Sequence, residues 1–450
     1  MISLYGDQIA FVQHTGTTAS LVLLKWSASA SVGTIGAPTA PTSVAAASYR
    51  TCTAPCMTVM ALSANPNDTT SSPFYDYAND VLYVGADNGT LHKFTGAFNG
   101  TPAEVVSSGA NVWPAAVSTT ALTSPVFDST TNKIFIGSAR SGTAAGTGAL
   151  HAVDSTIGSG SGGITSSGQL FVNSMTGTFD APIVDSSTGM VYVFVGDDFN
   201  NAGHSAVYQF STGTSLATQT SPNKATVSQN STNTGTTLWA GGFDDTYYAG
   251  AGNTGHLYGC GHTKANENPT PVRVAMSGTF GGSVTIATND LAGGGNDCSP
   301  TTTYSNNGAQ YAFLSVASGG NDPTCTGACA YMLQLLPAYD AATTSSTMAG
   351  TTQYMSVSTS TALSTTEASV GTTVTAANAG TYSGMTITQG ANSPGVRRIS
   401  TRCASRGRTP GSRARSGPRP TPAAIRRIPR CTLPATRSTC RFPGQSGRAA

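Results

Sequence analysis

The sequence predicts an all-β protein: a β-propeller of about six to seven four-stranded blades, incomplete, followed by a disordered arginine-rich tail. Three observations lead to this prediction. A strand–turn–strand pattern repeats along the chain, the composition disfavours long helices, and the composition changes abruptly near residue 395. We therefore expect the propeller at residues 1–395 and the tail at 396–450.

The composition is that of a chain built from short strands and turns. Charged residues make up only 9% of the 450 residues, and there are 52 glycines. Gly and β-branched Thr lower helix propensity, and Thr favours strands. Propellers of this length are built around one axis, so the length does not require two domains.

The clearest repeat is a hairpin template that occurs three times. A proline precedes a short strand that ends at an aspartate, and a second apolar strand then ends at a glycine. The three copies are residues 73–85, 125–137 and 182–196, each followed by a further strand, at 91–94, 150–153 and 206–210. Proline suits a strand entry, Asp followed by small polar residues favours a tight turn, and the apolar run fills a strand buried on both faces.

Weaker copies extend the repeat in both directions. They pair 8–12 with 20–24, 245–250 with 256–258, and 310–314 with 331–335. Successive units are 52 to 64 residues apart, near known blade periods of about 40 to 50 residues. We expect blade cores near 8–26, 73–94, 125–153, 182–210, 243–260 and 308–335, and a partial seventh at 370–390.

Charge divides the chain into two regions. Eight basic residues stand against twenty acidic ones before Val396, a balance of 8 − 20 = −12, whereas fourteen arginines and no acidic residue follow it. An acidic body disfavours nucleic acid as a partner. A tail rich in Arg, Pro, Ala and Gly without Lys is typical of a shifted reading frame in a GC-rich gene, which we favour. The alternative is a genuine basic tail that binds nucleic acid or an anionic surface.

Six cysteines lie in the body, and their spacing predicts disulfides rather than zinc. Proximity in sequence favours pairing Cys52 with Cys56, Cys325 with Cys329, and Cys260 with Cys298, out of fifteen connectivities. Disulfides indicate an oxidising compartment. A zinc site remains the alternative, but the Cys-x-x-x-Cys spacing and the lack of a following histidine pair do not match zinc motifs.

We expect an extracellular or periplasmic protein without a membrane span. The start of the chain runs directly into a strand pattern without a charged and apolar signal peptide, so we expect Met1 to be an internal start of a longer exported precursor. The longest apolar runs, such as 191–195, are far shorter than the roughly 20 residues that span a bilayer.

The segment Tyr83-Val-Gly-Ala-Asp-Asn-Gly-Thr-Leu-His92 resembles the repeat of quinoprotein-dehydrogenase-like (PQQ-like repeat) propellers. The segments 49–56 and 91–96 resemble secreted bacterial proteins of unassigned role. The resemblance implies a propeller without implying a dehydrogenase. The enzymes hold their cofactor with an adjacent-cysteine disulfide and a Trp platform, whereas this chain has no Cys-Cys pair and only three tryptophans. We therefore expect no quinone cofactor.

Three histidines are candidate metal ligands. His92 and His151 occupy equivalent strand positions, and His256 lies near the same place in a degenerate unit, so a propeller could gather them around one axis. Strand alternation explains them as well, because each strand has one polar face. We favour this strand-surface role.

Two acidic clusters are candidate sites. Asp197, Asp198, Asn200 and Asn201 offer oxygen ligands for Ca²⁺ as a cofactor, although the spacing is not that of an EF-hand. A solvated hairpin loop also explains them, and we favour it. The pair Asp244-Asp245 fits an acid/base couple or a turn, and we favour the turn. The sequence predicts no catalytic residue.

Three functional hypotheses follow. The first is an exported propeller that acts as a binding or surface-interaction module for an extracellular protein or carbohydrate. The second is an extracellular propeller enzyme that acts on a polysaccharide or small alcohol, with loop carboxylates converging over the channel. The third is a truncated fragment that does not fold alone, because an unclosed ring exposes strand edges.

Overall fold

The computed structural model describes residues 7–335, except 27–32, 35–36, 70, 140–146, 171–179, 202, 229–237, 251–253, 263–267, 287–289, 294–297, 307–308 and 322–326. Beyond residue 335 it describes four strands, at 352–356, 375–376, 385–388 and 398–401. The chain divides into two compact units, Met1–Arg402 and Cys403–Ala450, and the second lies outside the described residues. The expected tail therefore lies outside them too, apart from residues 398–401.

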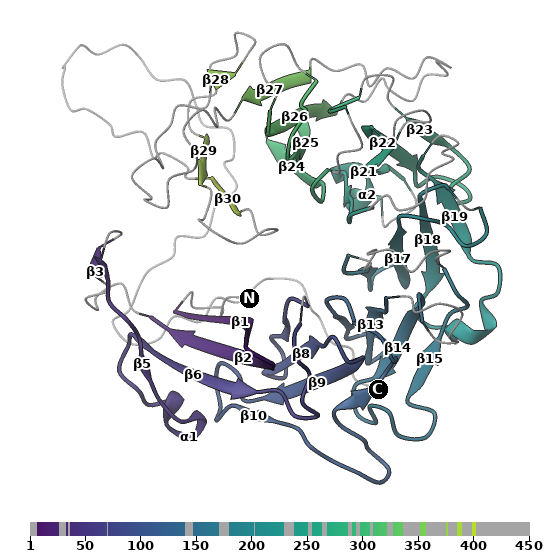
Figure 1. Ribbon diagram of the computed structural model, residues 1–450. Helices are drawn as coiled ribbons and strands as arrows, with labels where there is room; N and C mark the ends of the chain where they lie inside the picture. Colours follow the sequence, from purple (N-terminus) through teal and green to yellow (C-terminus); the bar gives the residue numbers. More distant parts are fainter. Residues whose placement is uncertain are drawn as a thin grey trace, which may run out of the picture. The chain divides into compact units, whose positions relative to one another are not determined.

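Six sheets follow one another along the first unit (Figure 1). Sheet 1 has the order β1 (Gln8–Thr15), β2 (Thr18–Lys25), β6 (Cys56–Ala61) and β5 (Thr42–Ser43). Sheet 2 contains β7 (Phe74–Asp76), β8 (Val81–Gly85), β9 (Thr90–Thr95) and β10 (Ala103–Glu104), with β11 (Ala115–Ala116) also on β9. Sheet 3 contains β12 (Val126–Asp128), β13 (Lys133–Gly137), β14 (Leu150–Asp154) and β15 (Ile164–Ser166).

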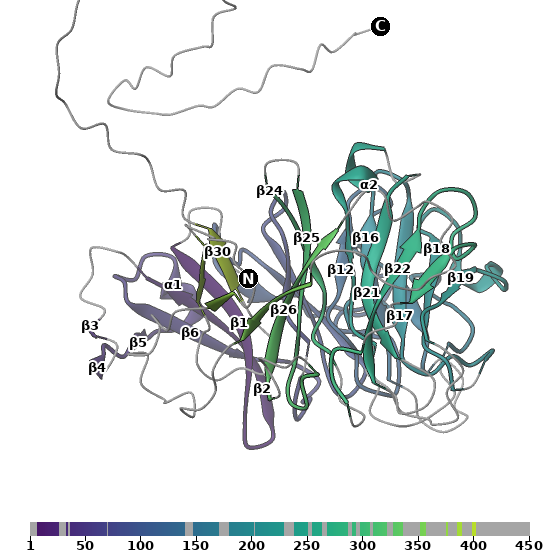
Figure 2. The same ribbon diagram turned by 90° about the horizontal axis from the view of Figure 1, so that it is seen from above.

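Strand β5 pairs with β6 in parallel in sheet 1, whereas the strands of sheets 4 to 6 are antiparallel and follow in chain order. Sheet 4 contains β16 (Ile183–Asp185), β17 (Met190–Val195), β18 (Ala206–Ser211) and β19 (Asn223–Thr226), which Figure 2 shows together. Sheet 5 contains β20 (Gly242–Phe243), β21 (His256–His262), β22 (Pro269–Ala275) and β23 (Val284–Ile286). Sheet 6 contains β24 (Thr302–Asn306), β25 (Ala309–Val316), β26 (Cys329–Leu335), β27 (Thr352–Ser356) and β28 (Thr375–Ala376).

A few short elements lie outside these sheets. Two small antiparallel pairs join β3 (Gly33–Thr34) to β4 (Ala37–Pro38) and β29 (Met385–Thr388) to β30 (Arg398–Thr401). The helical elements are α1 (Ala46–Tyr49), η1 (Leu216–Thr218) and α2 (Asp245–Ala249).

The hydrophobic core lies between the sheets. Five apolar clusters join sheet 1 to 2, 2 to 3, 3 to 4, 4 to 5 and 5 to 6. Sheets 2 to 5 therefore each bury both faces. The first strands of successive sheets also contact each other, β7 with β12, β12 with β16, and β20 with β24, so the sheets approach most closely at these strands. Four-stranded antiparallel sheets stacked face to face in chain order are the blades of a β-propeller, which confirms the predicted fold class.

The aspartate of the template builds the same turn in three blades. Asp76, Asp128 and Asp185 end the strands β7, β12 and β16. Each carboxylate accepts a hydrogen bond from the backbone N–H two residues later, at 3.0, 3.1 and 2.9 Å respectively. Such an Asx turn reverses the chain into the next strand.

Two of these aspartates also join neighbouring blades. Asp128 accepts a hydrogen bond from Ser186 Oγ of sheet 4 at 2.6 Å, and Asp185 accepts one from the Tyr247 hydroxyl of sheet 5 at 2.6 Å. Hydrogen bonds lower the pKa of both carboxyl groups, although burial alone would raise it. The repeated aspartate therefore fixes a turn and a blade junction together.

The predicted strand at 245–250 is wrong. Residues Asp245–Ala249 form helix α2, because Asp244 caps its start by accepting from Tyr247 N at 2.8 Å. His256 consequently begins β21, the second strand of sheet 5, whereas His92 and His151 lie in third strands. The expected equivalence of His256 with the other two histidines fails for the same reason.

Two disulfides join pairs of described cysteines, and both match pairs that the sequence predicts by proximity. Cys52 is bonded to Cys56, and Cys260 to Cys298. Cys329 is also disulfide-bonded, but Cys325, its expected partner, lies outside the described residues.

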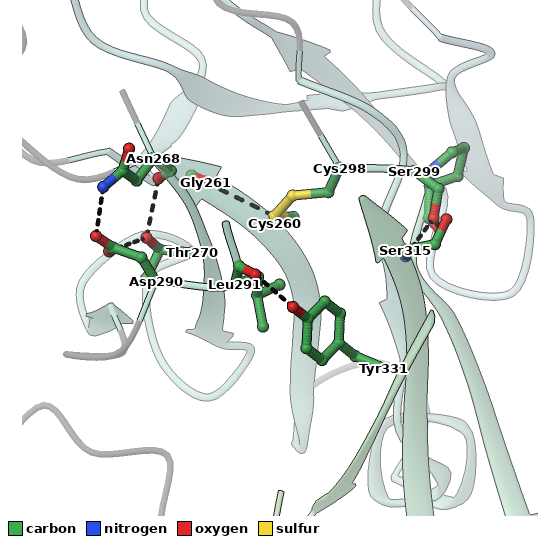
Figure 3. The surroundings of a disulfide bond; sticks show 11 residues. Cys260, Gly261, Asn268, Thr270, Asp290, Leu291, Cys298, Ser299, Ser315 and Tyr331 are labelled. Atoms are coloured by element: carbon green, nitrogen blue, oxygen red, sulfur yellow. Dashed lines mark hydrogen bonds between the residues drawn. A yellow bond between two sulfur atoms is a disulfide. The ribbon is translucent and has the colours of Figure 1, made fainter. Parts of the chain in front are cut away.

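The Cys260–Cys298 disulfide joins sheets 5 and 6 (Figure 3). Cys260 lies in β21, and the segment of Cys298 runs beside β25 of sheet 6, where Ser299 N donates to Ser315 O at 2.7 Å. The Tyr331 hydroxyl of β26 donates to Leu291 O of the same connection. The junction is therefore covalent as well as apolar.

Candidate functional site

A buried polar cluster lies where sheets 1 and 2 meet. His92 in β9 is fully buried, and its Nδ1 lies 2.6 Å from Glu104 Oε1 in β10. Glu104 also accepts from Ser63 N at 2.9 Å and from Ser63 Oγ at 2.8 Å, just after sheet 1 ends. These hydrogen bonds, from His92 first, hold the pKa of Glu104 low although burial alone would raise it.

Hydrogen-bond directions assign the protons in this cluster. Asn88 Oδ1 accepts from Thr90 N at 3.2 Å and from Thr90 Oγ1 at 2.6 Å, while its Nδ2 donates to Ala64 O. The Thr90 hydroxyl proton is thus used, so Thr90 Oγ1 accepts from His92 Nε2, 2.8 Å away. His92 therefore links Thr90 to Glu104 through its two ring nitrogens, and both contacts are within hydrogen-bonding distance.

The order hydroxyl, imidazole, carboxylate is also that of a nucleophilic triad, but its chemistry is structural here. Thr90 donates its proton to Asn88 and not to His92, so the imidazole does not act as its base. The cluster instead links β9, β10 and the end of sheet 1. Sequence patterns missed Glu104 because it lies in a two-residue strand that no periodicity signals.

His151, at the equivalent position in sheet 3, has a different environment. It is fully buried, and its ring nitrogens lie 2.7 Å from Ser166 Oγ and 2.8 Å from Ser138 Oγ. The two serine hydroxyl groups can hydrogen-bond to a neutral imidazole. Burial lowers the pKa of His151 to about 4. The expected strand-surface role is wrong for both histidines, because the packed neighbouring blades cover both faces of these strands.

We expect His151 to make the protein less stable in mild acid. The unfolded chain takes up a proton as the pH falls below about 6.5, whereas the folded protein does not until about pH 4. Stability should therefore fall between these values, by about 3 kcal/mol in total. Chemical denaturation of the wild type and His151→Gln across this range measures the effect. If the stability of His151→Gln falls with pH as steeply as that of the wild type, the prediction is wrong.

His256 and the Asp244-Asp245 pair form a local cap. Asp244 Oδ2 lies 3.0 Å from His256 Nδ1, while its Oδ1 caps α2. Asp245 N donates to Gln310 Oε1 of sheet 6 at 3.0 Å. These groups hold the helical turn between β20 and β21, as the turn interpretation expects.

The loop proposed for Ca²⁺ lies between β17 and β18. Asp197 and Asp198 are buried, whereas Asn200 and Asn201 are exposed. Asp198 accepts from the Tyr208 hydroxyl and from Asn200 N, and its Oδ2 lies 2.5 Å from Lys224 Nζ. Burial and the hydrogen bond to Asp198 raise the pKa of Tyr208. Both carboxylate oxygens of Asp198 therefore already accept from donors within the protein.

Two features are absent from the described residues. These residues hold no group of three His, Cys, Asp or Glu side chains arranged to bind a metal ion. Their helices include none that is long and apolar enough to cross a membrane.

Sheet 1 carries an apolar face that none of the core clusters of the described residues includes. Phe11 pairs with Val22, and Val22 with Val59, so these side chains share one face. Phe11 is 38% exposed and Val59 40%. We call it the open face of sheet 1, and it comprises Ile9, Phe11, Val22, Leu24, Trp26, Met57 and Val59.

The opposite face of sheet 1 shows how such a surface is used. It carries Ala10, Leu21 and Leu23, which are fully buried against sheet 2. The open face has the same apolar character, but Phe11, Trp26 and Val59 are partly exposed there, whereas Val22 is buried. Phe11, Trp26 and Val59 are three of the eight large exposed hydrophobic residues in the described part of the chain. Gathered exposed apolar side chains mark interaction surfaces.

Comparison with known proteins adds one structural likeness. No protein-family model matches the sequence, and no curated protein matches it. The crystal structure of BamB from Moraxella catarrhalis is similar over 74% of this chain and 71% of its own, with 12% identity and a TM-score of 0.34. At these values the assignment of the fold rests on the six sheets themselves.

Proposed function

We propose that the protein is an exported β-propeller that acts as a binding module, with the open face of sheet 1 as its contact surface for a partner protein. The exposure of Phe11 and Val59 on sheet 1, and of Trp26 directly after β2, supports the proposal. The disulfides Cys52–Cys56 and Cys260–Cys298 support export, because disulfides persist in oxidising compartments.

The chemistry of the surface indicates the partner. The open face lacks charged side chains and continues the pattern of the other blade junctions, in which an apolar sheet face covers an apolar sheet face. Its occupant is therefore a partner protein that presents an apolar β-sheet surface, and its contribution to binding scales with the apolar area removed from water.

The test compares the wild type with Phe11→Ser/Val59→Ser. Both residues are partly exposed, so we expect little loss of stability, but binding to a partner isolated with the wild type should weaken at least about tenfold. Tyr77→Ser, which alters an aromatic residue 44% exposed in the turn between β7 and β8, is the matched control and should bind normally. Affinities measured with the purified partner provide the result.

Two outcomes would contradict the proposal. Equal binding by the double variant and the wild type would remove the open face from the interface. Sedimentation showing a wild-type dimer that the double variant converts to a monomer would identify a second copy of the chain as the occupant.

A further inference from the structure

A groove on sheet 4 forms a second candidate surface, separate from the open face of sheet 1. It has a volume of about 410 Å³ and lies between the end of β18 and the segment from η1 to β19. Ten residues line it, and none of them is charged. Most carry hydroxyl or amide groups, and Met190 and Pro222 add partly exposed apolar surface.

Internal hydrogen bonds hold the walls of the groove in place. Gln219 Oε1 accepts from Ser211 N at 2.7 Å, and Gln219 Nε2 donates to Ser211 O at 3.0 Å. On the other side Asn223 Nδ2 donates to Gln209 Oε1 at 2.9 Å, and Gln209 Nε2 donates to the buried Tyr192 hydroxyl. The groove is therefore largely formed before a ligand arrives, which lowers the entropic cost of binding.

The exposed polar groups of the groove indicate its ligand. Thr220, Ser221 and Asn223 are exposed and present hydroxyl and amide groups at the opening. We propose that the groove binds a neutral oligosaccharide. Sugar hydroxyls match this set of donors and acceptors, and the C–H faces of a sugar ring match Met190 and Pro222.

Other ligand classes fit the groove less well. An anionic ligand would lose its hydration on entering the groove, and no positively charged side chain in the lining would compensate for that loss. A peptide that adds to a strand needs free backbone groups, but Gln219 already binds both the N–H and the carbonyl of Ser211.

Calorimetry with the full chain tests the proposal, using an α-1,4-linked and a β-1,4-linked glucose hexasaccharide as neutral probes. We expect saturable binding of at least one probe, weakened at least about tenfold in Thr220→Ala/Asn223→Ala. Thr130→Ala, an exposed threonine of sheet 3 outside the groove, is the matched control and should bind like the wild type.

Three results would overturn the assignment. These are no binding of either neutral probe, binding that the double variant leaves unchanged, and preferential binding of a galacturonate hexasaccharide or an extended peptide. None of them alters the affinity for a protein partner at the open face of sheet 1, so failure of this inference is distinguishable from failure of the proposed function.

Discussion

Removal of the Cys260–Cys298 disulfide should lower the free energy of unfolding by about 4 kcal/mol, because it releases a loop of 38 residues in the unfolded chain. The bond also joins two blades, so its loss leaves the junction of sheets 5 and 6 without a covalent link, held by apolar contacts and hydrogen bonds. Denaturant unfolding of Cys260→Ala/Cys298→Ala under oxidising conditions measures the change.

The second disulfide provides the control for this prediction. Cys52 and Cys56 are only 4 residues apart, so Cys52→Ala/Cys56→Ala should cost about 2 kcal/mol. Hydrogen exchange should then separate the effects by position, with faster exchange in β21 and β25 only when Cys260 and Cys298 are replaced. An equal or larger cost for the short loop would contradict the role of Cys260–Cys298 as the main covalent link.

Replacement of Glu104 by alanine should destabilise the protein by about 3 to 5 kcal/mol, since it leaves the buried His92 without its carboxylate. The Ser63 N–H and hydroxyl lose their acceptor in the same variant. The exposed fractions of the paired side chains are 0% for His92 and 11% for Glu104, so water replaces these contacts poorly. Equilibrium unfolding at neutral pH gives the value.

An exposed pair of the same chemistry is the matched control. Asp68 lies 2.8 Å from His14, but their side chains are 48% and 52% exposed, so Asp68→Ala should cost less than about 1 kcal/mol. The wild-type contribution of Glu104 is present above the ordinary glutamate pKa and is lost as the pH falls through its lowered folded value. Similar costs for the two variants would show that His92 and Glu104 do not form a stabilising pair.

The regular part of the fold could be predicted because its signals are local. Pro73, Pro125 and Pro182 precede strands β7, β12 and β16, and the aspartate three residues later begins a turn in each case. An apolar run such as Val81–Gly85, buried along its whole length, also follows from composition alone. Such patterns depend only on residues close together in the sequence, so one sequence is enough to recognise them.

The errors arose where tertiary contacts override a local pattern. The aromatic run from Asp245 to Ala249 fits a strand, but the cap from Asp244 and the stacking of Tyr247 on Phe243, with ring centroids 3.9 Å apart, select a helical turn. His92 and His151 alternate like surface residues, yet the adjacent blades cover them. No signal within one strand reveals that a second sheet lies on each face.

The candidate surfaces also depend on tertiary contacts and not on a local sequence pattern. Glu104 meets His92 across two strands and Ser63 across two blades, and the groove on sheet 4 forms only when Gln219 folds back on Ser211. The sequence by itself determined the blade repeat, its turns and the cysteines within reach of each other, because these follow from spacing along the chain. Only the tertiary structure decided which polar groups are buried and paired and which apolar side chains of the described residues are exposed, because burial depends on the packing of residues far apart in sequence.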